Sequence, residues 1–151
     1  MMLRAPRSTK YYQGRFVPKH PEKYVGDVNN IVFRSSWELK MMKWLDETPA
    51  ILKYSSEELK IPYRSPKDGE LHRYYPDFLI EYVTKDGDIK KALLEVKPER
   101  ETQPPKGGGR NYQQRAITYA VNQSKWKAAT AFAKQNGMEF LVLTEHHLGI
   151  K

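Results

Sequence analysis

The chain of 151 residues contains no cysteine, so it can form no disulfide and offers no thiolate to a metal ion. It has no apolar run long enough to cross a bilayer, and its basic N-terminus lacks the apolar core of a signal peptide. These absences argue against a disulfide-stapled secreted domain and a helical membrane protein, and they fit a reducing cytosol. The length suits one domain with its own core.

Acidic residues are too few to balance the basic ones: 26 Lys and Arg face 18 Asp and Glu, for a net charge of +8. The excess is uneven, because residues 1–44 and 97–134 each carry +6 while residues 45–96 carry −3. Basic flanks can neutralise phosphates and guide a polyanion toward an acidic centre. A basic surface without that function explains the charge equally well.

Two apolar stretches predict neighbouring β-strands. Residues 74–82 and 91–97 are rich in aromatic and branched side chains, and Asp86-Gly87 between them is a hairpin turn signal. Asp77 lies near the start of the first stretch, whereas Glu95 and Lys97 lie at the end of the second. Glu95 and Lys97 share a face because they are two residues apart. We therefore expect two carboxylates and an ammonium at one end of a sheet.

Such a group of side chains suits phosphodiester hydrolysis. Carboxylate oxygens are ligands for Mg²⁺ or Mn²⁺, and a lysine can orient water or stabilise transition-state charge. Either Pro76-Asp77 or the Glu-x-Lys of residues 95–97 alone is commonly a solvated strand edge. Their conjunction favours a nuclease, because buried strands seldom end in unpaired charges.

Pro76-Asp77 followed by Glu95-Val96-Lys97 resembles the PD-(D/E)XK nuclease superfamily. The resemblance implies an α/β, restriction-endonuclease-like core from about residue 31 to 143, with a small mixed β-sheet flanked by helices. It also implies that Asp77 and Glu95 bind the metal with the Val96 carbonyl as a further ligand, and that Lys97 positions the attacking water.

Glu38 has two explanations. Ser35 and Glu38 form the Ser-x-x-Glu capping box that begins a helix, which needs no catalysis to justify it. Residues 34–38 also resemble the superfamily's acidic first-helix position, which implies a metal ligand or a supporting group. We expect Glu38 to support the metal.

The remaining segments complete an order of helix, strands, helix and strand. A basic, aromatic N-terminal arm spans residues 1–30 and the nuclease-like domain spans residues 31–151, with Phe16 and Tyr24 expected to anchor the arm. The other expected elements are a helix with the core stripe Trp37, Met41, Trp44 and Leu45, strands near 51–54 and 58–63, an irregular loop at 98–110, helical residues 111–136 with a joint near 122–124, and a strand at 140–143.

Basic side chains outside the motifs are candidates for contact with the phosphates of double-stranded DNA. They are Arg15, Lys19, Lys23, Arg34, Arg73, Lys106, Arg110 and Arg115. His72 is expected on the surface, and the pair His146-His147 is not expected to bind metal because no ligand cluster accompanies it.

A narrower resemblance rests on several short motifs spread over the chain. They are Phe16-x-Pro18, Pro21-x-Lys23-Tyr24-x-Gly26-Asp27, the segments 34–38, 54–58 and 61–63, and the run 73–78. Together they resemble the head-completion nucleases of T-even-type tailed phages. This implies a phage-encoded endonuclease of the host cytoplasm, or of the virion, that acts on packaged DNA ends or the portal vertex before tail joining. Portal and head-completion proteins are its implied partners.

Two alternatives stay open. A transposon-end endonuclease of the TnsA type shares the helix-Glu, Pro-Asp and acidic-x-Lys layout, although such proteins usually carry a further partner-binding domain. A non-catalytic protein that binds DNA ends or heads could also use a nuclease scaffold. Metal binding separates this last alternative from the enzymes.

Overall fold

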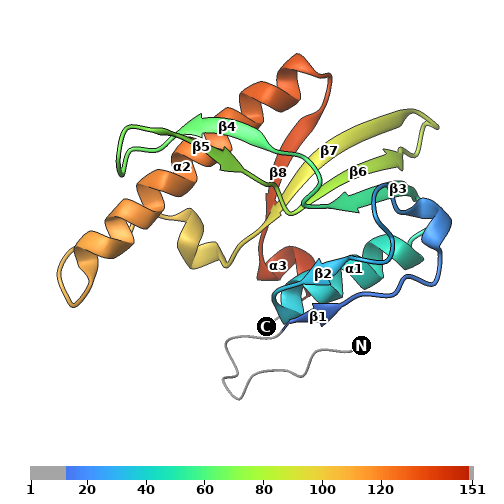
Figure 1. Ribbon diagram of the computed structural model, residues 1–151, viewed down its shortest axis with the longest axis horizontal. Coiled ribbons are helices and arrows are strands. Elements are labelled where there is room, and N and C mark those ends of the chain that lie inside the picture. The colour runs from blue at the N-terminus through green and yellow to red at the C-terminus, as the bar shows by residue number, and fades with distance from the viewer. Residues whose placement is uncertain (1–12, 150–151) are drawn as a thin grey trace.

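The computed structural model describes residues 13–149, and its centre is a four-stranded sheet (Figure 1). The strands follow the order β3 (Ile51–Ser56), β6 (Phe78–Val83), β7 (Ile89–Val96) and β8 (Glu139–Leu143). The first three are antiparallel to their neighbours, whereas β7 and β8 run parallel. The sheet is therefore mixed, and the predicted α/β class is confirmed.

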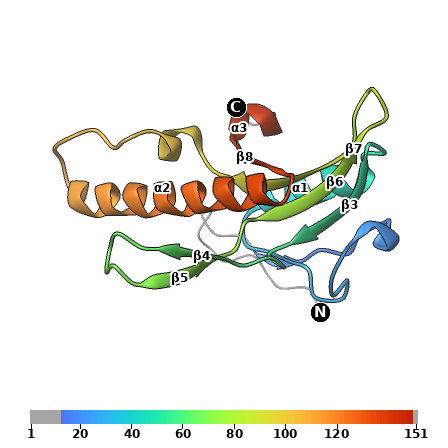
Figure 2. The same ribbon diagram turned by 90° about the horizontal axis from the view of Figure 1, so that it is seen from above.

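Helices cover both faces of this sheet, which explains why its central strands are apolar on both sides. Helix α1 (Ser36–Glu47) packs with one buried cluster and α2 (Tyr112–Gln135) with another (Figure 2). Because β7 and β8 are parallel, the chain needs a long crossover between them, and α2 provides it. A short helix, α3 (Glu145–Leu148), follows β8.

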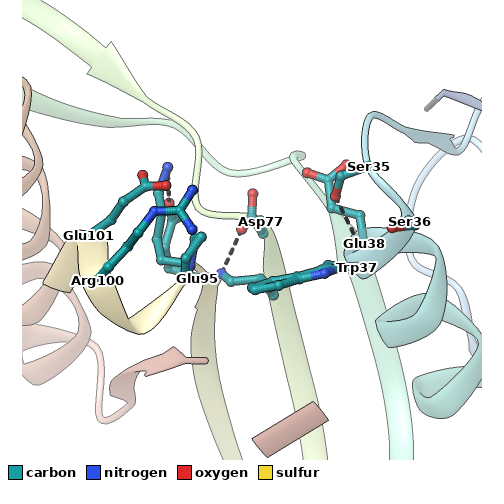
Figure 3. A pocket seen from close by; sticks show the side chains of 11 residues that line it. Ser35, Ser36, Trp37, Glu38, Asp77, Glu95, Arg100 and Glu101 are labelled. Atoms are coloured by element: carbon teal, nitrogen blue, oxygen red, sulfur yellow. Dashed lines mark hydrogen bonds and ion pairs between the residues drawn. The ribbon is translucent and has the colours of Figure 1, made fainter. Parts of the chain in front are cut away.

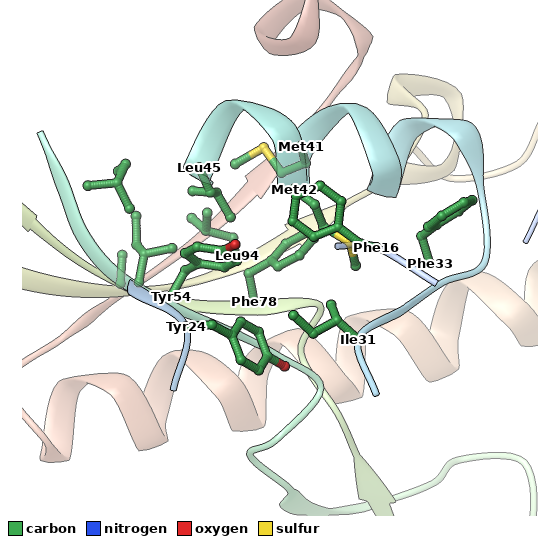
Figure 4. Close-up of a cluster of buried hydrophobic side chains, with 13 residues drawn as sticks. Phe16, Tyr24, Ile31, Phe33, Met41, Met42, Leu45, Tyr54, Phe78 and Leu94 are labelled. Carbon is green, nitrogen blue, oxygen red and sulfur yellow. The ribbon is translucent and has the colours of Figure 1, made fainter. Parts of the chain in front are cut away.

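The first cluster lies between α1 and the sheet (Figure 4). Met41, Met42 and Leu45 of α1 pack with Phe78 of β6 and Leu94 of β7. The predicted stripe was partly wrong, because Trp44 is 52% exposed, whereas Met42 is fully buried. Trp37, also predicted in the stripe, is only half-buried. The apolar face of α1 is thus rotated toward Met42.

Residues 13–30 are part of the same core. The predicted anchors Phe16 and Tyr24 are both buried. The fully buried Asp46 carboxylate accepts hydrogen bonds from the Lys19 backbone N–H at 2.8 Å and the Tyr54 hydroxyl at 3.0 Å. The predicted arm therefore packs against α1 from residue 13 onward, and the basic residues before it lie outside the described part of the chain.

Lys23 stabilises the end of α1 instead of facing solvent. Its ammonium donates to the carbonyls of Leu45 and Asp46, each at 2.8 Å, and of Thr48 at 3.0 Å. These are carbonyls that a helix C-terminus leaves without partners. Burial lowers the pKa of Lys23, and its ammonium is not available for the DNA contact that the sequence suggested.

A hairpin of β4 (Ile61–Arg64) and β5 (Leu71–Tyr74) packs on α2 and extends with it away from the main sheet (Figure 1). The predicted joint near residues 122–124 was wrong, since α2 is continuous. Asn122 is buried within α2, and tertiary packing overrides the weak local preference of Asn and Ser.

The predicted strand at 74–82 is divided in the structure. Tyr74 ends β5 in the hairpin, Phe78 begins β6 in the main sheet, and residues 75–77 cross between the two sheets. Pro76 cannot donate a ladder hydrogen bond, which suits a crossing point. Asp77 therefore lies on the connection between the sheets.

Short elements complete the described chain. They are β1 (Gly14–Arg15), β2 (Val32–Phe33) and the 3₁₀ turns η1 (Pro21–Lys23) and η2 (Glu99–Thr102). The turn η2 lies in the segment 98–110 that was predicted to be irregular throughout. None of the helices in residues 13–149 combines the length and apolarity that a bilayer crossing requires.

Candidate active site

A polar pocket lies between the N-terminus of α1 and η2, where β6 begins and β7 ends (Figure 3). Its cavity has a volume of about 550 Å³. The charged residues in its lining are Glu38, Asp77, Glu95, Lys97, Arg100 and Glu101. All four residues that the sequence proposed as catalytic therefore line one pocket, with carboxylates outnumbering cations.

Asp77 lies at the centre of the pocket (Figure 3). Its Oδ2 accepts a hydrogen bond from the Val96 backbone N–H at 2.7 Å, which ties the connection before β6 to the end of β7. Burial, followed by repulsion from Glu95, raises the pKa of Asp77 well above its usual range. Binding of a cation would stabilise the charged form of a carboxylate in such surroundings.

Glu38 is positioned by the start of α1. The Ser35 side chain accepts from the Glu38 backbone N–H at 3.1 Å, and Glu38 Oε1 accepts from the Arg34 backbone N–H at 2.5 Å. Burial raises the pKa of Glu38, and the nearby Glu57 adds to the rise. Ser35 therefore caps the helix, whereas the Glu38 carboxylate accepts from the residue before the N-cap and lines the pocket, so only the Ser35 half of the predicted capping box forms among the described residues.

Glu57 is a further carboxylate, next to Glu38 and Asp77, that the sequence prediction missed. Oxygen atoms of Glu38, Glu57 and Asp77 all lie within 4.8 Å of one another. Glu57 follows β3, its backbone N–H donates to the Asp77 carbonyl at 3.2 Å, and its carboxylate pairs with Arg34. Its left-handed backbone, with φ of 54°, costs about 1 kcal/mol or more and brings the chain back toward Asp77.

The missed residue had a signal in the sequence. Glu57 immediately follows a strand that pairs with β6, and Ser56 lies opposite Phe78, next to Asp77. An acidic residue at that position was visible in the motif 54–58, but its relation to Asp77 depends on the strand pairing.

Glu95 and Lys97 share a face at the end of β7, as their spacing predicted. Glu95 Oε2 lies 3.8 Å from Lys97 Nζ, and Glu95 Oε1 accepts a hydrogen bond from the Tyr74 hydroxyl at 2.6 Å. Burial raises the pKa of Glu95, while Tyr74 and Lys97 oppose the rise. Within the described chain, Glu95 does not join the cluster of Glu38, Glu57 and Asp77.

Lys125 of α2 adds a second ammonium behind Glu95. Its Nζ lies 5.8 Å from the ring centre of Tyr74 and 5.9 Å from that of Tyr63. Burial and repulsion from Lys97 lower its pKa, while Glu95 and Asp77 attract the charged form. The sequence prediction did not place Lys125 at this site, because nothing local to α2 links it to residues 74 and 95.

The carboxylates fit a hard divalent cation. Opposite ligands of Mg²⁺ lie about 4 Å apart, since each Mg–O bond is about 2.0–2.1 Å. Oxygens of Glu38, Glu57 and Asp77 lie within 4.8 Å of one another, which is comparable to this span. Excess negative charge and raised carboxylate pKa values both favour cation binding.

Replacing Tyr74 by Phe should shift the pH dependence of activity. The Tyr74 hydroxyl stabilises the charged form of Glu95, so its removal raises the pKa of Glu95 further. If ionised Glu95 is required, the acid limb of the pH–rate profile moves to higher pH, while the rate above that limb changes less. Profiles of the parent and Tyr74→Phe measured with Mg²⁺ check this, and coincident acid limbs would contradict it.

The predicted DNA-contact residues are dispersed over several elements, and none of them lines the pocket. Arg73 is exposed on β5, and Lys106, Arg110 and Arg115 are exposed on the loop before α2 and on its first turns. Arg115 also stacks on Tyr112 and donates to the Gly108 carbonyl at 3.2 Å. These placements leave the DNA role as a prediction.

Two of the other candidates pair with carboxylates. Arg34 pairs with Glu57, and Lys19 lies 3.5 Å from Glu47 on the surface. Arg15 is exposed in β1. Of the histidines, His72 is at the surface as expected and pairs with Asp68 at 2.8 Å. His147 is part of the capping box of α3.

Comparison with known proteins finds similarity to nucleases. Residues 48–145 match the family model described as the TnsA-like endonuclease N terminal domain. The chain is also 37% identical over 144 residues to the head completion nuclease of Enterobacteria phage T4, with 91% of this chain and 93% of that protein covered.

These two matches bear out both resemblances drawn from the sequence. The family match spans more than half of the chain, including Glu57, Asp77, Glu95 and Lys97, although it begins after Glu38. The relative matches nearly the full length at an identity that indicates common descent. The chain belongs to the TnsA-like endonuclease family, and with it to the restriction-endonuclease-like nucleases.

Proposed function

We propose that this protein is a Mg²⁺- or Mn²⁺-dependent endodeoxyribonuclease of the PD-(D/E)XK type. The observation that carries the proposal is the convergence of Asp77, Glu38 and Glu57 within 4.8 Å beside the Glu95–Lys97 pair. Carboxylates from three separate segments that converge beside a lysine have no role in packing the core. They suit hydrolysis of a phosphodiester.

Each side chain has a distinct part in the proposed reaction. Asp77, Glu38 and Glu57 would hold one metal ion, and Glu95 would hold it or a second one, with the Val96 carbonyl as a further candidate ligand. A bound Mg²⁺ supplies Lewis acidity to a phosphate oxygen and makes water a stronger nucleophile. Lys97 donates a hydrogen bond that orients the attacking water, and Glu95 keeps the ammonium of Lys97 in place.

Tyr74 and Lys125 act through Glu95 in this scheme. The hydroxyl of Tyr74 occupies Glu95 Oε1 and leaves Oε2 toward Lys97. The positive charge of Lys125 attracts the same carboxylate. Both favour the ionised form of Glu95 and oppose the rise in its pKa that burial causes.

Double-stranded DNA is the proposed substrate. The β4–β5 hairpin carries Arg73, and the loop before α2 and its first turns carry Lys106, Arg110 and Arg115. The α1 side carries Arg15 and Arg34. Positive charge on both sides of the pocket would bind the DNA backbone and neutralise its repulsion from the carboxylates. Lys23 is not part of this surface, since its ammonium caps α1.

The biological role that we propose is completion of phage heads. The relative from phage T4 is a head completion nuclease by name. By this analogy the chain would act in the infected cell on packaged DNA ends or at the portal vertex before tail joining, with head-completion proteins as partners. If so, this chain supplied in trans should restore infectious particles to a T4-type phage lacking its own head completion nuclease, and Asp77→Asn should not.

Catalysis itself is tested by plasmid nicking. We expect the purified protein to convert supercoiled plasmid to open-circular or linear forms with Mg²⁺ or Mn²⁺, and to leave it intact with EDTA. Nicking that persists in EDTA would contradict metal dependence. Absence of both metal binding and DNA cleavage would favour the non-catalytic alternative, a DNA-binding protein on a nuclease scaffold.

A further inference from the structure

Arg100 enters the active-site pocket from η2, the side opposite α1 (Figure 3). Its guanidinium points into the cavity on the Glu95 side of Asp77, whereas Glu38 lies on the other side. The residue is three positions after Lys97, outside the motif that the sequence singled out. It is the pocket's second cation.

The turn that carries Arg100 is fixed by its neighbours. The Glu99 backbone N–H donates to Glu145 Oε1 at 2.7 Å, and Glu99 Oε2 lies 2.6 Å from His146 Nε2, so α3 holds η2 twice. The Glu101 backbone N–H donates to the Pro98 carbonyl at 2.9 Å. A turn attached in this way keeps the base of the arginine side chain in a constant position.

The guanidinium is not neutralised at close range. Glu95 and Glu101 line the same pocket, yet among residues 13–149 no carboxylate oxygen lies within 4.0 Å of a nitrogen of Arg100. A planar guanidinium presents five N–H donors in a fork that matches two oxygens of a phosphate. An arginine that points into a polar pocket without a paired carboxylate is suited to an anionic ligand.

We propose that Arg100 is a further catalytic residue, which donates hydrogen bonds to the non-bridging oxygens of the scissile phosphate. This inference rests on the proposed nuclease function. Lys97 and Arg100 then divide the work: Lys97 orients the water, while Arg100 stabilises the negative charge that builds on the phosphoryl oxygens as the new P–O bond forms and the old one breaks. Donors aimed at developing charge contribute most in the transition state.

The test compares Arg100→Ala and Arg100→Lys with the control Lys90→Ala. Lys90 is exposed at the far end of β7, so its replacement removes one positive charge away from the pocket. Three quantities are measured: the single-turnover cleavage rate at saturating DNA with Mg²⁺, the Kd for DNA with Ca²⁺ in place of Mg²⁺, and the Kd for Mn²⁺.

We expect Arg100→Ala to lower the cleavage rate about 10²-fold, the usual loss for one donor to transition-state charge. Arg100→Lys keeps the charge without the fork, so its loss should be smaller but clear. The Kd values for DNA and Mn²⁺ should change by less than about 3-fold in both variants, since the effect belongs to the transition state. Lys90→Ala should match the parent in all three.

Two results would overturn the role of Arg100 while leaving the nuclease intact. One is a cleavage rate for Arg100→Ala within about 3-fold of the parent, which is the behaviour of an ordinary surface arginine. The other is a weakening of Mn²⁺ binding that accounts for the whole loss of rate. Arg100 would then support the structure of the metal site and would not act on the phosphate. A parent protein that cleaves no DNA with any divalent metal would overturn the proposed function itself, and this inference with it.

Discussion

Asp77→Asn should reduce DNA cleavage at least about 10³-fold, because a metal-assisted reaction loses several kcal/mol when its central ligand is lost. Asp77 lies between Glu38 and Glu95 and shares the acidic cluster with Glu38 and Glu57. Asparagine keeps an oxygen for the Val96 N–H, so the connection before β6 should survive. Single-turnover cleavage at saturating Mg²⁺ measures the loss.

The same variant should be more stable than the parent without metal. Burial and Glu95 raise the folded-state pKa of Asp77 above its unfolded value. A carboxyl group whose pKa is higher in the folded than in the unfolded state stabilises the fold fully only below its unfolded-state pKa. This stabilisation is lost as the pH rises through the folded-state pKa. At neutral pH in EDTA, Asp77→Asn should therefore increase the free energy of unfolding by about 1–2 kcal/mol, as many active-site replacements do.

This stability gain also serves as the folding control. It should shrink at acidic pH, where the parent carboxylate is already protonated in both states. An inactive Asp77→Asn that is less stable than the parent in EDTA would indicate damage to the fold. Undiminished cleavage by a well-folded Asp77→Asn would remove Asp77 from the mechanism.

Lys97→Met should lower the rate of cleavage by about 10²–10⁴-fold, the range found when a group that handles the attacking water is lost. Methionine keeps much of the aliphatic side chain, so packing at the end of β7 should change little. The ammonium that faces Glu95 Oε2 disappears. Because Lys97 is not proposed as a metal ligand, Mn²⁺ should still bind to the variant.

This combination distinguishes Lys97 from the carboxylates. A variant that binds Mn²⁺ and DNA but cleaves slowly fits a role in the chemical step. Lys90→Met is the matched control, since it removes an exposed lysine from the same strand at its other end. Equal rates for Lys97→Met and Lys90→Met would contradict the assignment.

The local pattern predicted the elements of the site better than the contacts between them. The hairpin turn signal, the two apolar stretches and the two-residue spacing were enough to predict Glu95 and Lys97 on one face near Asp77. Glu38 followed from its position three residues after the N-cap Ser35, which fixes the start of α1. These side chains depend on short-range geometry, and such geometry is visible in sequence.

Contacts made across the fold were not predictable in the same way. Glu57 reaches Asp77 through the pairing of β3 with β6, and Lys125 reaches Tyr74 and Glu95 through the packing of α2 on the β4–β5 hairpin. Arg100 faces the pocket because α3, near the end of the chain, holds η2. Each of these depends on a tertiary contact that no local window contains.

Packing also overruled two local signals. Trp44 has the helical spacing of a core residue, yet it is exposed because the N-terminal segment covers α1 on the side of Met42 and Asp46. The polar run at 122–124 suggested a joint, yet α2 continues through it and buries Asn122. Both errors arose where the partner of a helix face was unknown.

The central claim is that separate segments bring carboxylates to one point where a divalent cation binds. Calorimetric titration of the metal-free protein with Mn²⁺, for the parent, Asp77→Asn and Lys97→Met, tests it most directly. The account predicts saturable binding by the parent and by Lys97→Met, and a loss of that binding in Asp77→Asn. Absence of binding to the folded parent, or equal binding by Asp77→Asn, would contradict it.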